Sequence, residues 1–186
     1  MTQYAYPDAD TTVNNWTAST GSDRYAMIDD AHDVAASTAD NTYITDGGNG
    51  GAIILSLSNP FSSVTTPSAR TDHKVRVLWS DDSGSSAVTL NINLKDTDGS
   101  DVKNQDFSYE DTSEEMDGSP SFSIMTLSTS QANSIGAYNN LTLTLTATEG
   151  MGMGATTNIY QAYFECPDAA ASSTTTNAPF LLFLDW

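Results

Sequence analysis

Residues 96–101 carry the pattern that comes nearest to a metal-binding loop in this chain. Their sequence, Asp-Thr-Asp-Gly-Ser-Asp, has the alternate aspartates and the glycine found at the start of an EF-hand calcium loop. The third acidic ligand, which should precede the glycine, is missing, and so is the bidentate glutamate at the twelfth position. Asp-Gly between two alternating strands is also a strong hairpin signal. We therefore expect a turn rather than a calcium site, and the sequence predicts no metal and no cofactor.

Acid–base or nucleophilic chemistry would need partners that this sequence does not place together. His32 and His73 stand far apart, and neither is near a Gly-x-Ser-x-Gly or His-x-x-His pattern, so we expect surface side chains. The single cysteine, Cys166, falls in phase with Tyr160 and Phe164 and is expected to be a buried strand thiol. Two of the many carboxylates could form a glycosidase pair, but no spacing selects them. We predict that the chain is not an enzyme.

Aromatic side chains offer another kind of site, because an aromatic ring combines a large apolar surface with, in Tyr and Trp, a polar group. Trp16, Tyr25 and Tyr43 are the candidates for a sugar-binding face on the sandwich described below. Packing in the core explains the same three residues equally well, so both interpretations stay open.

The charge of the chain limits its partners. There are 24 acidic residues against 6 basic ones, for a formal net charge of -18, and the segment at residues 110–118 alone carries five carboxylates. Such a surface repels nucleic-acid phosphates and anionic lipids. The first ten residues have neither the basic region nor the apolar core of a signal peptide. We expect no nucleic-acid partner, no membrane partner, and synthesis in the cytoplasm.

The elements that would position any site are strands with apolar residues on alternate positions. In residues 88–94 and 141–148 every second side chain is apolar, which places one face against a core and the other in water. A short helix is expected at residues 131–135, capped by one of the hydroxyl residues 128–130. The predicted fold is all-β, an antiparallel, jelly-roll-like β-sandwich. The expected strands are residues 25–28, 42–45, 52–58, 74–79, 88–94, 102–109, 122–127, 141–148 and 158–166.

The composition divides the chain into three parts. Residues 1–168 form the sandwich domain, residues 169–177 are a linker rich in Ala, Ser and Thr, and residues 178–186 are an apolar C-terminal arm. An apolar terminus must dock somewhere, and we expect it to contact a neighbouring subunit, as a strand added to a sheet edge. The alternative is that it covers its own sandwich. The predicted contact residues are Phe180, Leu181, Leu182, Phe183, Leu184 and Trp186.

Several short phrases of this sequence resemble small β-sandwich virion proteins of tailed bacteriophages. In order along the chain they are PDAD at 7–10, WT at 16–17, YAMIDD at 25–30, NTYI at 41–44, HKVRV at 73–77, LSTSQA at 127–132, IGAYNNLTL at 135–143 and AYFECPD at 162–168. Members of that family ordinarily end near the last of these phrases, so the resemblance assigns no role to the arm.

The resemblance implies a non-enzymatic structural protein of a phage particle. The main expectation is a capsid decoration, or cement, protein on the virion surface, whose partners are the major capsid protein and copies of itself. The alternative is a receptor- or glycan-binding module of a phage tail or fibre.

Overall fold

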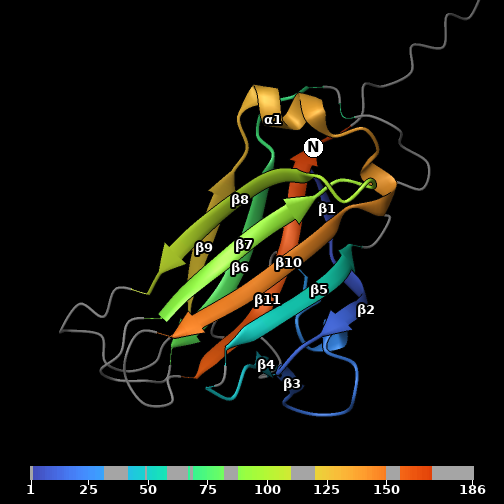
Figure 1. Ribbon diagram of the computed structural model, residues 1–186. Helices are drawn as coiled ribbons and strands as arrows, with labels where there is room; N and C mark the ends of the chain where they lie inside the picture. Colours follow the sequence, from blue (N-terminus) through green and yellow to red (C-terminus); the bar gives the residue numbers. More distant parts are fainter. Residues whose placement is uncertain are drawn as a thin grey trace, which may run out of the picture.

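Two antiparallel sheets pack face to face around one core, and they confirm the predicted β-sandwich (Figure 1). This computed structural model describes residues 2–31, 42–48, 50–57, 67, 69–81, 88–109, 120–149 and 156–168. The linker and the arm lie outside these residues, as do His32 and the acidic segment at 110–118, so the predictions made for them stay predictions. No helix in the described part of the chain is long and apolar enough to cross a membrane.

The first sheet is centred on β11, the longest of the described strands. On one edge β11 pairs with β6, which pairs in turn with β9; on its other edge it pairs with β1 near one end and with β4 near the other. The strands of this sheet are β3 (Thr17–Ala18), β4 (Ile44–Thr45), β1 (Thr2–Ala5), β11 (Thr157–Pro167), β6 (Lys74–Asp81) and β9 (Ser121–Thr126).

The second sheet has the strand order β2-β5-β10-β7-β8. Its strands are β2 (Pro7–Val13), β5 (Gly51–Leu57), β10 (Thr142–Glu149), β7 (Val88–Lys95) and β8 (Asp101–Ser108). Leu143 lies between Leu55 and Leu94 in this sheet. All three are buried, as strict alternation requires. The successive strands β9, β10 and β11 alternate between the sheets, as in a jelly-roll-like fold.

The predicted short helix is confirmed as α1 (Thr129–Ser134). Ser128 caps it, because the Ser128 side chain accepts from the Gln131 backbone N–H while the Gln131 side chain accepts from the Ser128 N–H. A 3-10 turn, η2 (Tyr138–Asn140), follows it. The expected turn at residues 96–101 is also confirmed: Gly99 has φ +82°, and its N–H donates to the Asp96 carbonyl.

The prediction of a strand at residues 25–28 is wrong, since this segment forms the 3-10 turn η1 (Tyr25–Met27). Its conformation is held by Asp10 of β2, whose two carboxylate oxygens accept from the backbone N–H groups of Arg24 and Tyr25, both at 2.8 Å. The contact joins residues about fifteen positions apart, and short-range alternation cannot reveal it. The segment before it contains β1, β2 and β3, and none of these three is among the expected strands.

Candidate functional site

Four aromatic side chains gather on the outer face of the first sheet, around Tyr163 of β11. The Tyr4 ring lies 5.9 Å from the Tyr163 ring and the Tyr6 ring 6.0 Å from it, on one side. Phe122 of β9 packs edge-on against the same ring at 6.5 Å. Phe122 is 39% exposed, whereas Tyr163 is 4% exposed and forms the floor. We call Tyr4, Tyr6, Phe122 and Tyr163 the aromatic patch.

The register of β11 explains why Tyr163 faces outward. Tyr163 pairs with Arg76 of β6 and Glu165 pairs with Lys74, whereas the alternate residue Phe164 faces the core. A register shift between Ile159 and Gln161 sets this phase. The shift makes Tyr160 the extra residue of the strand, so Tyr160 does not share a face with Phe164 as the sequence predicted.

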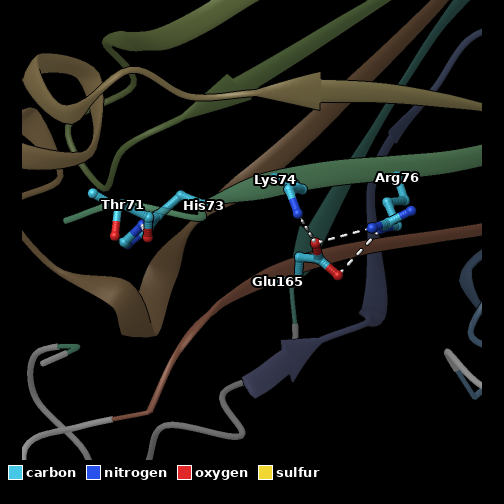
Figure 2. A network of polar contacts seen from close by, with 5 residues as sticks. All are labelled: Thr71, His73, Lys74, Arg76 and Glu165. Atoms are coloured by element: carbon cyan, nitrogen blue, oxygen red, sulfur yellow. Dashed lines mark hydrogen bonds and ion pairs between the residues drawn. The ribbon is translucent and has the colours of Figure 1, made fainter. Parts of the chain in front are cut away.

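A charged cluster borders the aromatic patch. The Arg76 guanidinium binds both Glu165 carboxylate oxygens, with Nε–Oε2 at 3.2 Å and Nη2–Oε1 at 3.3 Å, and Lys74 Nζ lies 3.3 Å from Oε1 (Figure 2). The hydrogen bond with Glu165 raises the pKa of Arg76, and burial raises the pKa of Tyr163 to about 12. At neutral pH the site therefore presents a neutral phenol beside two cations and one carboxylate.

This face differs in charge from the chain as a whole. Lys74 and Arg76 are two of the six basic residues of a chain with net charge -18, and with Glu165 they sum to one positive charge, two cations minus one anion. The long-range field of the chain still repels anions. The site therefore suits a neutral ligand that has both apolar surface and hydrogen-bonding groups.

The expectation that His73 is a surface side chain is wrong, because His73 is fully buried. The Thr71 carbonyl can only accept, so Nδ1–H donates to it at 2.9 Å, and Nε2 accepts from the Tyr138 hydroxyl at 2.8 Å. Figure 2 shows His73 beside Thr71. Tyr138 in turn accepts from Arg70 Nη1 at 2.7 Å. Both ring nitrogens are occupied by structural hydrogen bonds, which leaves the neutral imidazole without a free site for catalysis.

The buried His73 predicts a pH dependence of stability. Burial lowers its pKa, the nearby Arg70 lowers it further, and the bond to Thr71 and the charge of Asp72 oppose the shift. Because the unfolded chain binds the proton first, the stabilisation is complete above pH 6.5 and is lost as the pH falls through the lower folded pKa. Urea unfolding between pH 7 and pH 5 should show stability falling by at most about 1.4 kcal/mol per pH unit from this group. His73→Gln, which leaves His32 in place, should flatten the curve; an unchanged slope would contradict this assignment.

Cys166 is buried, as the sequence predicted. Burial raises the pKa of its thiol to about 12, so the thiolate needed for nucleophilic attack is not populated at neutral pH.

The aromatic residues proposed from the sequence for a sugar-binding face are not members of the aromatic patch. Trp16 is only 1% exposed, and its indole N–H donates to the Gly51 carbonyl at 3.2 Å. Tyr25 packs against the core, and the Tyr43 ring lies 5.6 Å from the Tyr160 ring, away from the aromatic patch. Of the two interpretations left open by the sequence, core packing is therefore the one that holds for Trp16.

Two open hollows lie elsewhere, and among the described residues that line them one side chain is ionisable. One, of about 450 Å³, is lined by Asn14, Asn15, Gly48, Gly50, Gly51, Ala147 and Thr148. The other, of about 440 Å³, lies between β2 and η2, and Asp8 is the ionisable residue among those that line it. Among the described residues, no three His, Cys, Asp or Glu side chains are grouped as metal ligands would be.

No known protein family and no curated protein matches this sequence. Several solved structures are similar to it in part, at low identity. The xylan-binding module CBM15 has a TM-score of 0.43 and 12% identity, over 87% of this chain and 97% of that module. TmCBM61, solved with β-1,4-galactotriose, has a TM-score of 0.38 and 9% identity, over 90% of this chain and 88% of that chain.

The enzymatically active domain of tailspike protein 4 from bacteriophage CBA120 has a TM-score of 0.41 and 9% identity. The match covers 88% of this chain but only 19% of that chain. The resemblance to phage virion proteins therefore rests on the short sequence phrases between residues 7 and 168 and on no family match.

Proposed function

We propose that this chain is a non-catalytic binding module that takes a neutral saccharide on the outer face of its first sheet. The observation that carries the proposal is the aromatic patch beside the cluster of Lys74, Arg76 and Glu165. A sugar ring has apolar C–H faces and hydroxyl edges, so it complements rings that lie next to fixed charged donors and acceptors. The proposal corresponds to the glycan-binding alternative raised from the sequence, with a different set of residues.

The two kinds of group have separate roles in this proposal. Phe122, the most exposed ring, packs against the apolar face of the sugar, and Tyr163 supports it from below. The Arg76–Glu165 pair is held by two hydrogen bonds before any ligand arrives, so little side-chain entropy is lost when it meets a hydroxyl. The net charge of -18 disfavours sulfated or sialylated sugars.

Replacing Phe122 with alanine should weaken saccharide binding about tenfold, the loss of roughly 1.4 kcal/mol of ring contact. The ligand is first found on an array of neutral oligosaccharides, and affinities are then measured by calorimetry. Ile124→Ala is the matched control, because Ile124 lies on the same strand with a similar exposure of 41% but has no ring. It should change the affinity less than about twofold. If the wild-type chain binds no neutral saccharide at millimolar concentration, or if both variants weaken it equally, the proposal is wrong.

The second candidate is the capsid decoration protein on the virion surface, with the major capsid protein and further copies of this chain as partners. The exposed apolar side chains of Phe122 and Ile124 favour it, because such residues mark protein contacts as well as ligand sites. The protein composition of purified virions distinguishes the candidates. Hundreds of copies on tailless heads would support decoration, whereas a few copies on the tail would exclude it.

A further inference from the structure

The four outer edges of the two sheets are not protected equally against strand addition. Natural edges are blunted by short strands, charged residues, proline or register shifts. One edge of the first sheet is formed by the short strands β1 and β3, which have four and two residues. In the second sheet, the edge strand β2 begins at Pro7 and shifts register twice, and the edge strand β8 carries two aspartates and a lysine. β9, with the sequence SFSIMT, has six residues, no charge and no proline, and its pairing with β6 is unshifted. In the described part of the chain, β9 is thus the edge that lacks these protections.

Every second residue of β9 directs its backbone N–H and C=O groups away from the sheet. The Leu127 N–H donates to the His73 carbonyl at 2.9 Å, so His73 and Leu127 form a hydrogen-bonded pair, and along the register the next such pair includes Met125. The non-hydrogen-bonded pairs alternate with these, and their β9 members are Phe122, Ile124 and Thr126. These three residues therefore direct their N–H and C=O groups outward, away from β6.

One end of this edge is already satisfied. Lys103 Nζ of β8 donates to the Thr126 carbonyl at 2.7 Å, which agrees with the outward direction of that carbonyl. The groups of Ile124 and Phe122 lie beyond this contact, and their side chains are the two large apolar ones exposed among the described residues, at 41% and 39%. A partner strand with apolar side chains would satisfy the backbone and lie beside these two side chains, which would extend the apolar surface of the edge.

The chain itself supplies such a segment. β11 runs parallel to β9, since both are antiparallel to β6, and Glu165, Lys74 and Thr126 share one row across the three strands. The chain therefore leaves β11 at the same end of the sheet where β9 finishes. A segment returning from that end alongside β9 would run antiparallel to it, which is the favourable direction.

The distance suits the linker. The slot beyond β9 is three strand spacings, about 14 Å, from β11. Residues 169–179 can extend to about 36 Å, and a flexible chain of that length has an average span of about 18 Å. The effective concentration of the arm at its own β9 edge is then in the millimolar range. Docking a second copy would in addition bring together two chains of charge -18.

We propose that residues 180–186 add to β9 of the same chain as an antiparallel strand. A period of two places four apolar side chains, Phe180, Leu182, Leu184 and Trp186, on one face of that strand, where they extend the exposed surface of Phe122 and Ile124. Of the two alternatives for the arm, this is the one in which it covers its own sandwich. The proposal is separate from saccharide binding, which is measured independently.

Amide hydrogen exchange on the full chain tests this proposal. The outward N–H groups of Phe122 and Ile124 should be protected, and the full-chain variant Leu182→Asp/Leu184→Asp should speed their exchange at least about a hundredfold. The N–H groups of Ser123 and Met125, which face β6, are the internal control and should be unaffected. Fast exchange at Ile124 in the wild-type chain overturns the proposal. So does protection that disappears on about a hundredfold dilution, because it would identify a second copy as the partner.

A second comparison uses the indole of Trp186. Ile124→Pro removes an outward N–H without removing a bond to β6, and proline is tolerated at such edge positions. It should release the arm and shift the Trp fluorescence to the red, whereas Ile124→Thr, which keeps the N–H, should shift it less. Equal spectra for the two variants would overturn the strand pairing. Saccharide affinity, measured on the same proteins, reports on the proposed function independently.

Discussion

Replacing Trp16 with alanine is expected to lower the free energy of unfolding by about 3–5 kcal/mol, the usual cost of emptying a buried aromatic site. Trp16 is 1% exposed and belongs to the core cluster between the sheets. Its indole N–H donates to the Gly51 carbonyl, so the substitution also removes a hydrogen bond that fixes the start of β5. Urea unfolding should show a lower midpoint at an unchanged m-value.

Phe122→Ala is the comparison for this variant, because the two substitutions should have opposite effects on stability and on saccharide binding. Phe122 is exposed, so its loss should cost little stability while weakening saccharide binding. Trp16→Ala should do the reverse, with an affinity close to that of the wild type at temperatures where the variant is folded. If Trp16→Ala left the midpoint unchanged and abolished binding, Trp16 would be a ligand-contacting residue and its buried position here would be wrong.

The sandwich could be predicted because its strands repeat one simple rule. In β7 and β10 every second residue is apolar, and each of these side chains is buried between the sheets. Lys74 and Arg76 follow the same rule, since they alternate with the buried Val75 and Val77. The rule fails where one residue is inserted, as at Tyr160, because a bulge is set by pairing across strands and leaves no mark in local alternation.

The candidate site was missed because its members come from three separate regions of the chain. Tyr4, Tyr6, Phe122 and Tyr163 become neighbours only when β1 pairs with one end of β11 and β9 pairs with β6. Alternation within residues 162–166 already placed Tyr163 opposite the buried Phe164. That was the available signal, although it could not say which other rings would surround Tyr163.

The burial of His73 could not be predicted from the sequence for a different reason. A polar residue at the start of a strand is usually solvated. The Tyr138 hydroxyl that hydrogen-bonds to His73 is 65 positions away, and no local sequence pattern predicts this contact. Buried polar side chains depend on partners of this kind, and those partners are set by tertiary structure. Sequence periodicity therefore identifies apolar cores far better than it identifies buried hydrogen-bond networks.

Replacing Gly51 with alanine should destabilise the chain by about 3 kcal/mol or more. Gly51 has φ +144°, in a region that side chains rarely adopt, and a Cβ there would collide with the backbone carbonyl oxygen of Asn14. The same close approach lets the Trp16 indole reach the Gly51 carbonyl. A backbone atom cannot rotate away as a side chain can, so β2 or β5 would have to move.

Gly99→Ala is the comparison for this effect, because it changes a positive-φ glycine where there is room for a Cβ. Gly99 also has positive φ, +82°, but a Cβ there meets no atom within 4 Å, so only the backbone strain of about 1–2 kcal/mol remains. Urea midpoints of the two variants, compared at equal m-values, measure the difference. The larger loss at Gly51 combines the collision with Asn14 and the less favourable backbone conformation at φ +144°. Equal losses at the two positions would mean that the N-terminal segment does not pass this close to β5, and the position of Trp16 in the core would have to be revised with it.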